Sequence, residues 1–114
     1  MVAVIQTMKS LGASPPIPLS QYPSQWRTPV GLLLNFSGGG PAVGTATVQI
    51  SNDPLALTSP TTVAWNAHDL MQGLTADTNS SLIVCVVAVR LLVTAYTSGV
   101  ITLQVCQTDR VYGG

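Results

Sequence analysis

Short apolar stretches rich in β-branched residues run along the whole chain, separated by glycine, proline and asparagine. The clearest stretches are residues 30–36, 43–51, 89–96 and 100–106. In residues 43–51 apolar and polar side chains alternate, which is typical of a strand with one buried and one wetter face. Glutamate is absent and lysine occurs once, so residues that favour helices are scarce. The sequence therefore predicts an all-β fold.

Weaker signals extend this pattern. Residues 2–8, 61–65 and 81–87 are also expected to be strands, and residues 66–74 could hold a single helical turn that ends near Gly73. Seven or eight short strands with regular turn signals predict a single-domain antiparallel β-sandwich, jelly-roll-like or immunoglobulin-like. Because the Cys…Trp…Cys arrangement of immunoglobulin domains is missing, we expect the jelly-roll-like form.

The last two strong strands flank a turn at residues 97–99, which predicts a tight hairpin. Apolar residues of the two strands are then expected to pair across it: Leu91, Val93 and Ala95 with Ile101, Leu103 and Val105. We expect this hairpin to be the most secure element of the fold.

Five prolines fall within residues 10–29, a density that a central strand does not tolerate. We therefore expect an extended proline-rich N-terminal arm over residues 1–28, a β-sandwich over residues 29–107 and a tail over residues 108–114. Deleting residues 1–28 is expected to weaken attachment to a partner and to leave the sandwich folded.

Aromatic and aliphatic side chains of this arm are too apolar for a free linker and are expected to dock, either on the chain's own sheet or on a neighbouring molecule. Trp65 is a further candidate, because large aromatic side chains often anchor contacts between proteins. The alternative is that the aromatic residues cover the edges of the chain's own core. The candidate assembly contacts are Ile17, Leu19, Tyr22, Trp26 and Trp65.

Charge is the unusual quantity in the composition, since 7% of residues are charged and the formal net charge is zero. Zero net charge favours association, so we expect a surface that is covered by partners in an assembly rather than a dilute secreted domain. The four basic residues are scattered, which argues against nucleic acid and anionic membranes as partners. The apolar runs are too short for a signal peptide or a membrane span, so we expect synthesis in a cytoplasm.

The residues offer little for catalysis or metal binding. His68 and Asp69 are adjacent, which is more typical of a turn than of a triad with Ser80 or Ser81. Asp69, Asp77 and Asn79 do not have the spacing of a calcium loop, and the glycines at 38–40 lack the lysine of a phosphate loop. We expect no catalytic residue, no cofactor and no metal. Cys85 and Cys106 are expected to be reduced, with a cross-strand disulfide as the alternative.

Residues 29–107 resemble a group of small structural proteins of tailed-bacteriophage virions. The likeness is carried by the segments Pro29–Asn35, Ala46–Ile50, Val63–Asn66 and, most of all, residues 88–107. The last segment follows the pattern A-x-R-L-x-V-T-x-Y-x-S-G-x-x-T-L-x-V-x-Q. The resemblance implies a capsid cement or decoration protein that bridges capsid subunits on the virion surface. Its partners would be the major capsid protein and other copies of itself.

A phage tail or receptor-binding module would use the same kind of sandwich. In that alternative, residues at a loop tip would bind glycans, and Trp65, His68 and Asp69 are the candidates.

Overall fold

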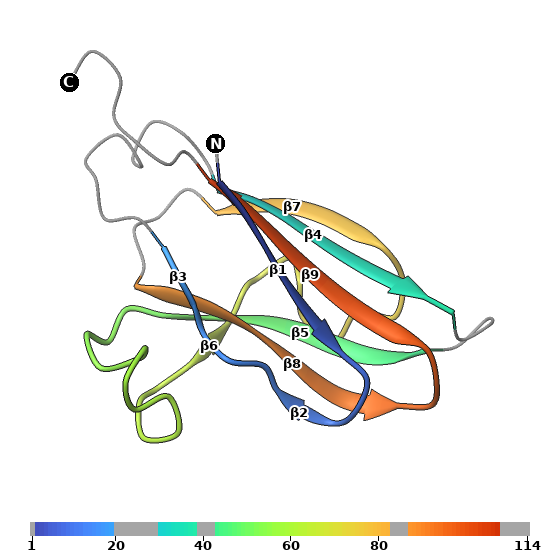
Figure 1. Ribbon diagram of the computed structural model, residues 1–114, viewed down its shortest axis with the longest axis horizontal. Helices are drawn as coiled ribbons and strands as arrows, with labels where there is room; N and C mark the ends of the chain where they lie inside the picture. Colours follow the sequence, from blue (N-terminus) through green and yellow to red (C-terminus); the bar gives the residue numbers. More distant parts are fainter. Residues whose placement is uncertain (1, 20–29, 39–42, 83–86, 108–114) are drawn as a thin grey trace, which may run out of the picture.

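The computed structural model describes residues 2–19, 30–38, 43–82 and 87–107, and this part of the chain contains strands and loops but no helix (Figure 1). The strands are β1 (Val2–Met8), β2 (Gly12–Ala13), β3 (Ile17–Pro18), β4 (Val30–Ser37), β5 (Gly44–Ser51), β6 (Asn66–Ala67), β7 (Thr78–Leu82), β8 (Ala88–Tyr96) and β9 (Val100–Gln107). The all-β fold that the alternating pattern predicts is confirmed.

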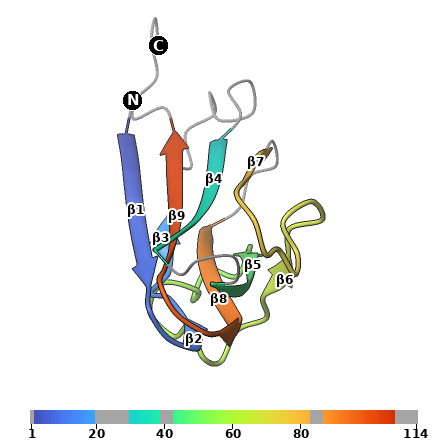
Figure 2. The same cartoon turned by 90° about the vertical axis from the view of Figure 1, so that its right-hand side faces the viewer.

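The strands form two antiparallel sheets that face each other across one core, a sandwich-like arrangement. Sheet A has the order β1-β9-β4-β7. Sheet B has the order β2-β8-β5-β6, with β3 also pairing with β8. Figure 2 shows β1, β9 and β4 side by side in one layer.

The core is built from the residues that alternate inward on the central strands of both sheets. On β4 and β9 of sheet A these are Val30, Leu32, Leu34, Ile101, Leu103 and Val105. On β5 and β8 of sheet B they are Ala46, Val48, Val89, Leu91 and Val93. All of them are buried, so the strand alternation read from the sequence points the expected side chains into the core.

The N-terminal residues belong to the sandwich: the strand expected over residues 2–8 is confirmed as β1, whereas an arm separate from the sandwich over residues 2–19 is wrong. β1 pairs with β9 along its whole length, from Val2 opposite Gln107 to Met8 opposite Ile101. β2 and β3 pair with β8 on the edge of sheet B. Proline is tolerated there, because an edge strand needs hydrogen bonds on one side only. The rest of the expected arm, residues 20–28, and the tail 108–114 lie outside the described residues.

The hairpin expected from β8 and β9 is also wrong, although both strands are where the sequence places them. β8 pairs with β5 in sheet B, and β9 pairs with β1 and β4 in sheet A. The turn at residues 97–99 therefore connects the two sheets. Leu91 and Val93 of β8 meet the apolar row of β9 across the core, because both rows point inward from opposite layers. Ala95 lies beyond a register shift in β8 and is exposed.

Three weaker expectations also differ from the structure in their details. Residues 61–65 form a loop, and the short strand that pairs with β5 is β6. The helical turn expected after it is a single hydrogen-bonded turn, in which the Met71 amide donates to the His68 carbonyl at 3.0 Å. β7 begins three residues earlier than the predicted strand 81–87, of which residues 83–86 lie outside the described part.

Candidate functional site

Two of the five candidate contact residues are part of the core. Ile17 of β3 lies opposite Val89 of β8 and is 1% exposed, and Leu19 is 8% exposed. Their side chains are covered by the chain itself, so their assignment as contacts to a partner is wrong. Of the two alternatives the sequence left open, docking on the chain's own sheet is the one observed. Tyr22 and Trp26 lie outside the described residues.

Trp65 lies just before β6 and is half-buried. Its indole Nε1 donates a hydrogen bond to the Pro60 carbonyl at 2.9 Å, which fixes the ring against the preceding loop. The Arg90 guanidinium lies over the ring at 4.3 Å from the centroid, a cation–π contact. Arg90 Nε also donates to Gln49 Oε1 at 2.8 Å. One face of the indole is therefore covered by Arg90.

Arg90 is the one charged residue in the nine strands that the structure describes. It lies on β8, where it points to the outer face of sheet B beside Gln49 of β5. Burial lowers the pKa of Arg90, but a guanidinium remains protonated in proteins. The outer face of sheet B therefore carries one positive charge, the Arg90 guanidinium, which contacts both Trp65 and Gln49.

His68 is buried, and both of its ring nitrogens are engaged with backbone groups. Nδ1 accepts a hydrogen bond from the Leu70 amide at 3.1 Å, which places the ring proton on Nε2. Nε2 then donates to the Ser81 carbonyl at 2.9 Å. The imidazole therefore joins the turn at residues 68–71 to β7 and contacts the Ser81 backbone rather than its hydroxyl. Asp69, next in the chain, is exposed.

The carboxylate of Asp77 is also used within the fold. One oxygen accepts the Phe36 amide at 2.8 Å and the other accepts Asn35 Nδ2 at 3.0 Å, so Asp77 holds the end of β4. Within the described ranges there is no group of three histidine, cysteine, aspartate or glutamate side chains placed to hold a metal ion. Cys106 carries a free thiol, and Cys85 lies outside the described part.

The outer face of sheet A is a surface that the sequence reasoning missed. The residues that alternate outward on its four strands are Ile5, Thr7, Gly31, Leu33, Asn35, Ser37, Asn79, Ser81, Val100, Thr102, Gln104 and Cys106. None of them is charged, and no strand of this sheet contains a charged residue. The signal was present in the sequence as uncharged, mostly polar residues at every second position of these strands, but finding the face required knowing which strands are neighbours.

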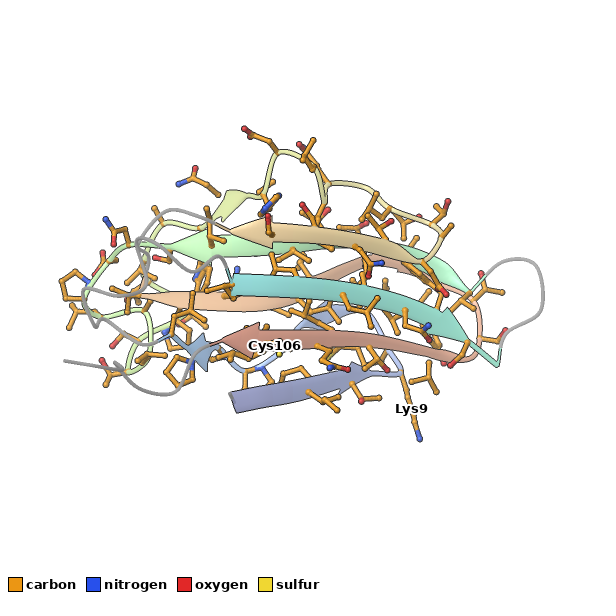
Figure 3. All side chains as sticks on the ribbon, turned by 90° about the horizontal axis from the view of Figure 1, so that it is seen from above. Lys9 and Cys106 are labelled. Atoms are coloured by element: carbon orange, nitrogen blue, oxygen red, sulfur yellow. The ribbon has the colours of Figure 1, made fainter. Side chains whose placement is uncertain are left out.

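The described charged residues other than Arg90 lie in turns and loops: Lys9, Asp53, Asp69 and Asp77. Figure 3 shows Lys9 projecting away from the sheets at the end of β1. Asp77 lies at the rim of the outer face of sheet A, where Asn35 occupies one of its oxygens. The face is thus uncharged at its centre, with charge only at its ends.

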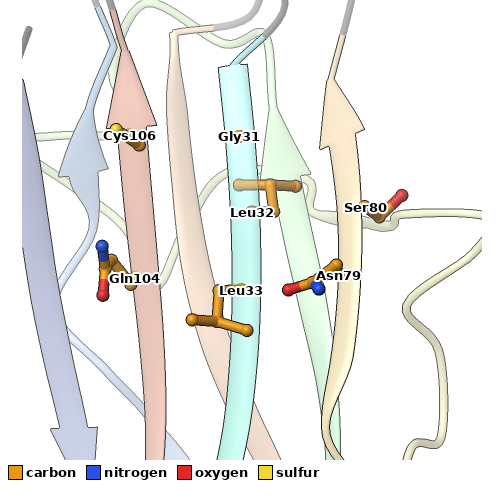
Figure 4. A pocket seen from close by; sticks show the side chains of 7 residues that line it. All are labelled: Gly31, Leu32, Leu33, Asn79, Ser80, Gln104 and Cys106. Carbon is orange, nitrogen blue, oxygen red and sulfur yellow. The ribbon is translucent and has the colours of Figure 1, made fainter.

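Two hollows lie on this face, on either side of Leu33. The larger, of about 280 Å³, is lined by Gly31, Leu32, Leu33, Asn79, Ser80, Gln104 and Cys106. The smaller, of about 190 Å³, is lined by Leu33, Asn35, Thr102 and Gln104. Figure 4 shows Leu33 on the central strand between Gln104 and Asn79, with bare backbone at Gly31 further along. The face therefore carries apolar side chains as well, among them the half-buried Leu33 and Ile5, which is 58% exposed, with depressions beside Leu33.

Comparisons of the chain with protein-family models, with curated proteins and with solved structures found no match. The described ranges contain no helix long and apolar enough to span a membrane.

Proposed function

We propose that the chain is a non-enzymatic structural protein of a phage virion, which decorates an icosahedral capsid and cements neighbouring capsid subunits. In this role it is made in the host cytoplasm and binds the major capsid protein and other copies of itself on the capsid surface. It needs neither nucleic acid nor membrane as a partner. The observation that carries the proposal is the outer face of sheet A, a broad sheet surface without a charged residue.

Such a face is better suited to being covered by a partner protein than to remaining exposed to solvent. Covering it costs no desolvation of ionised groups, and its amides and hydroxyls can form hydrogen bonds to a partner. Large apolar side chains are also exposed outside this face: Leu11 is 62%, Leu55 is 56% and Leu70 is 71% exposed. Where such groups lie together they form the kind of apolar patch that contacts other proteins, whereas single exposed apolar residues are common on any protein surface.

The strand pairing supports the finer proposal that the sandwich is a jelly roll. The first strand pairs with the last, β1 with β9, and the next pairs are β2 and β3 with β8, β4 with β7, and β5 with β6. This nested order is obtained when one long hairpin of paired strands is rolled into two sheets. Jelly rolls occur in viral capsid domains and in lectins, so the fold is compatible with the proposed role but does not specify it.

The rival function, a glycan-binding tail module, depended on a cluster of Trp65, His68 and Asp69. The His68 imidazole is buried with both nitrogens engaged, and Arg90 covers one face of Trp65. These two residues therefore offer less to a sugar than their sequence positions suggested. For this reason the capsid role ranks first.

Electron cryo-microscopy of the phage particle that carries the chain tests the proposal. We expect density matching the two-sheet sandwich at regular positions on the capsid lattice, in contact with more than one capsid subunit. Density confined to the tail, or no density on the particle, would contradict the proposal. Binding of the purified chain to a glycan array, together with tail density, would establish the rival function instead.

A further inference from the structure

We propose that Arg90 anchors a second contact surface, the outer face of sheet B, where its guanidinium binds an aspartate or glutamate carboxylate of a partner protein. The inference deepens the proposed function and rests on it for the identity of the partner, because a chain that bridges two capsid subunits needs two contact surfaces. The carboxylate site itself follows from the neighbours of Arg90 and from the charges of the described residues.

Two neighbours hold the guanidinium in one orientation. Its central carbon lies 4.3 Å from the centroid of the Trp65 ring, and its Nε donates to Gln49 Oε1 at 2.8 Å. Both neighbours are themselves fixed, since Gln49 lies on β5 directly opposite Arg90 and the indole Nε1 donates to the Pro60 carbonyl at 2.9 Å. The side chain is therefore ordered before a partner arrives, which lowers the entropy lost on binding.

These contacts leave one edge of the guanidinium for a ligand. A guanidinium has five N–H donors, and the bond to Gln49 uses the one on Nε. The four N–H groups of Nη1 and Nη2 have no acceptor among the residues that the structure describes. One N–H of each nitrogen points the same way, and such a fork binds the two oxygens of a carboxylate through parallel hydrogen bonds. The free edge is therefore suited to a carboxylate.

The positive charge of Arg90 has no counter-charge in the described part of the chain. The carboxylates there belong to Asp53, Asp69 and Asp77, all in loops, and none of them forms an ion pair with the guanidinium. Partial burial lowers the pKa of Arg90, which shows that its charge is partly removed from water. Covering this side chain further is favourable only if the partner supplies a negative charge.

The number of charges favours a carboxylate over a phosphate. Arg90 is the one charged residue in the nine described strands, and Lys9 projects away from the sheets at the end of β1 (Figure 3). A phosphate group carries about 1.5–2 negative charges near neutral pH, and nucleic acids need clustered cations. A single carboxylate carries one charge and matches one guanidinium.

The residues around the guanidinium suit a protein as the source of the carboxylate. Trp65 and Leu92, which is the next outward position along β8, are half-buried and uncharged. Tryptophan and arginine are enriched among the residues that dominate binding energy in protein interfaces, where surrounding contacts exclude water from them. Excluding water also strengthens the attraction between a guanidinium and a carboxylate.

Replacing chloride by acetate tests the carboxylate site on the purified full chain. The side-chain N–H signals of Arg90 Nε and Trp65 Nε1 are followed by heteronuclear NMR while sodium acetate replaces sodium chloride at constant ionic strength. We expect both signals to shift, and the shift of the indole signal to disappear in Arg90→Gln. Unchanged signals would overturn the proposal. A stronger effect of phosphate than of acetate at the same concentration would contradict the choice of a carboxylate.

Zero-length cross-linking on the particle identifies the partner. A carbodiimide activates carboxylates, and an amine in contact with one then forms an amide while the carbodiimide takes up water and leaves as a urea. Arginine does not react in this way, so Arg90→Lys introduces a reactive amine at the site. We expect mass spectrometry to find position 90 joined to an aspartate or glutamate of a capsid subunit, and no such product from the wild-type chain. A cross-link only to an aspartate of this chain or of another copy would contradict a partner protein.

Rebinding to particles that lack the chain provides a matched control. Arg90→Gln should weaken binding by about tenfold or more, and Arg90→Lys, which keeps the charge but loses the fork, should weaken it less. Lys9→Gln removes the same charge away from the stack and should bind like the wild-type chain. Circular dichroism verifies that each variant is folded. Equal losses for Arg90→Gln and Lys9→Gln would show that net charge, rather than this site, governs binding.

These experiments separate the inference from the proposed function. If acetate binds at Arg90 and the chain is absent from the capsid, the carboxylate site stands and the cement role fails. If the chain lies on the capsid and Arg90→Gln binds there as tightly as the wild-type chain, the cement role survives and the Arg90 contact is wrong.

Discussion

At the scale of single residues, Ser14 connects the N-terminal segment to the centre of sheet B. It is 4% exposed, and its Oγ accepts a hydrogen bond from the Leu91 amide at 2.9 Å. Its own amide donates to the Leu91 carbonyl at 2.8 Å. Ser14 thus satisfies both backbone groups of Leu91 in the interval between β2 and β3, where its Oγ replaces a strand carbonyl as the acceptor.

We expect Ser14→Ala to lower the free energy of unfolding by about 1–3 kcal/mol, because the buried Leu91 amide loses its acceptor. Urea-induced unfolding followed by circular dichroism measures the change. Ser10→Ala is the matched control, since Ser10 is exposed in the preceding turn and its loss should cost less than about 0.5 kcal/mol. Equal stabilities of the two variants would contradict this role of Ser14.

The His68 imidazole likewise connects two parts of the fold, since it joins a turn to β7. We expect His68→Ala to cost about 1–3 kcal/mol, because it removes the partners of the Leu70 amide and the Ser81 carbonyl. Asp69→Ala, at the exposed neighbouring position, should change stability by less than about 0.5 kcal/mol. Thermal or urea unfolding of the two variants makes the comparison. A larger loss for Asp69→Ala would show that the turn is held in another way.

The structural role of His68 could be predicted from the sequence, whereas that of Ser14 could not. A histidine beside an aspartate between turn signals indicated a turn, which is what His68 occupies. The role of Ser14 was not predictable, because its partner lies 77 residues away in the chain. Hydrogen bonds between strands depend on which strands become neighbours in a sheet, and a local pattern does not contain that information.

At the scale of elements, replacing two strand glycines, Gly44 and Gly31, with alanine is expected to change stability in opposite directions. A Cβ at Gly44 would overlap the Ala95 carbonyl oxygen and lie 3.1 Å from Tyr96 Cα, so β5 and β8 would have to separate. We expect Gly44→Ala to lose about 1–3 kcal/mol, as overpacking does. Gly31→Ala meets only ordinary contacts and should gain up to about 1 kcal/mol, because glycine is costly in a strand. Urea unfolding in dilute solution distinguishes the two, and stabilisation by Gly44→Ala would contradict the close approach.

The short strand β3 makes a similar prediction about the N-terminal segment. Ile17 is 1% exposed in the core, whereas Leu11 in the turn after β1 is 62% exposed. Ile17→Ala should therefore lower the free energy of unfolding by about 2–5 kcal/mol, and Leu11→Ala by much less. Chemical unfolding of both variants tests this, and similar losses would mean that the segment is held only loosely on sheet B.

Strand positions were predictable but strand partners were not. β4, β5, β8 and β9 begin and end within one residue of the predicted stretches. The pairing of β8 with β9 was wrong, because two inward rows of apolar side chains satisfy the same alternation whether the strands are neighbours or face each other across the core. A short turn between them did not decide the matter, since it can also connect two layers.

At the scale of the whole molecule, the first nineteen residues contribute to both sheets. β1 forms an edge of sheet A, and β2 and β3 form an edge of sheet B. We therefore expect a chain that lacks residues 1–19 to lose cooperative unfolding, contrary to the expectation from the sequence that an arm could be removed. Near-ultraviolet circular dichroism and a urea titration test this, with Leu11→Ala as the folded control. A cooperative transition of the shortened chain would mean that β4 to β9 are sufficient for the fold.

The candidate surface belongs to this scale as well, which is why the sequence did not reveal it. The low content of charged residues was visible in the sequence and favoured assembly, but it did not show which surface of the fold lacks charge. Only the order β1-β9-β4-β7 brings uncharged positions from four separate stretches together. The apolar residues chosen as contacts from the sequence, Ile17 and Leu19, are instead those that the sandwich buries.

The nested pairing of strands has a consequence for biosynthesis. β9 lies between β1 and β4, so the first strand to leave the ribosome has no neighbour in its layer until the last strand has been made. A nascent chain that ends before residue 100 thus exposes the apolar rows of β1 and β4, and β4 has only β7 to pair with. Folding of this domain is therefore expected to begin only after β9 has been made and to be slow for its length, as is usual where pairings are non-local.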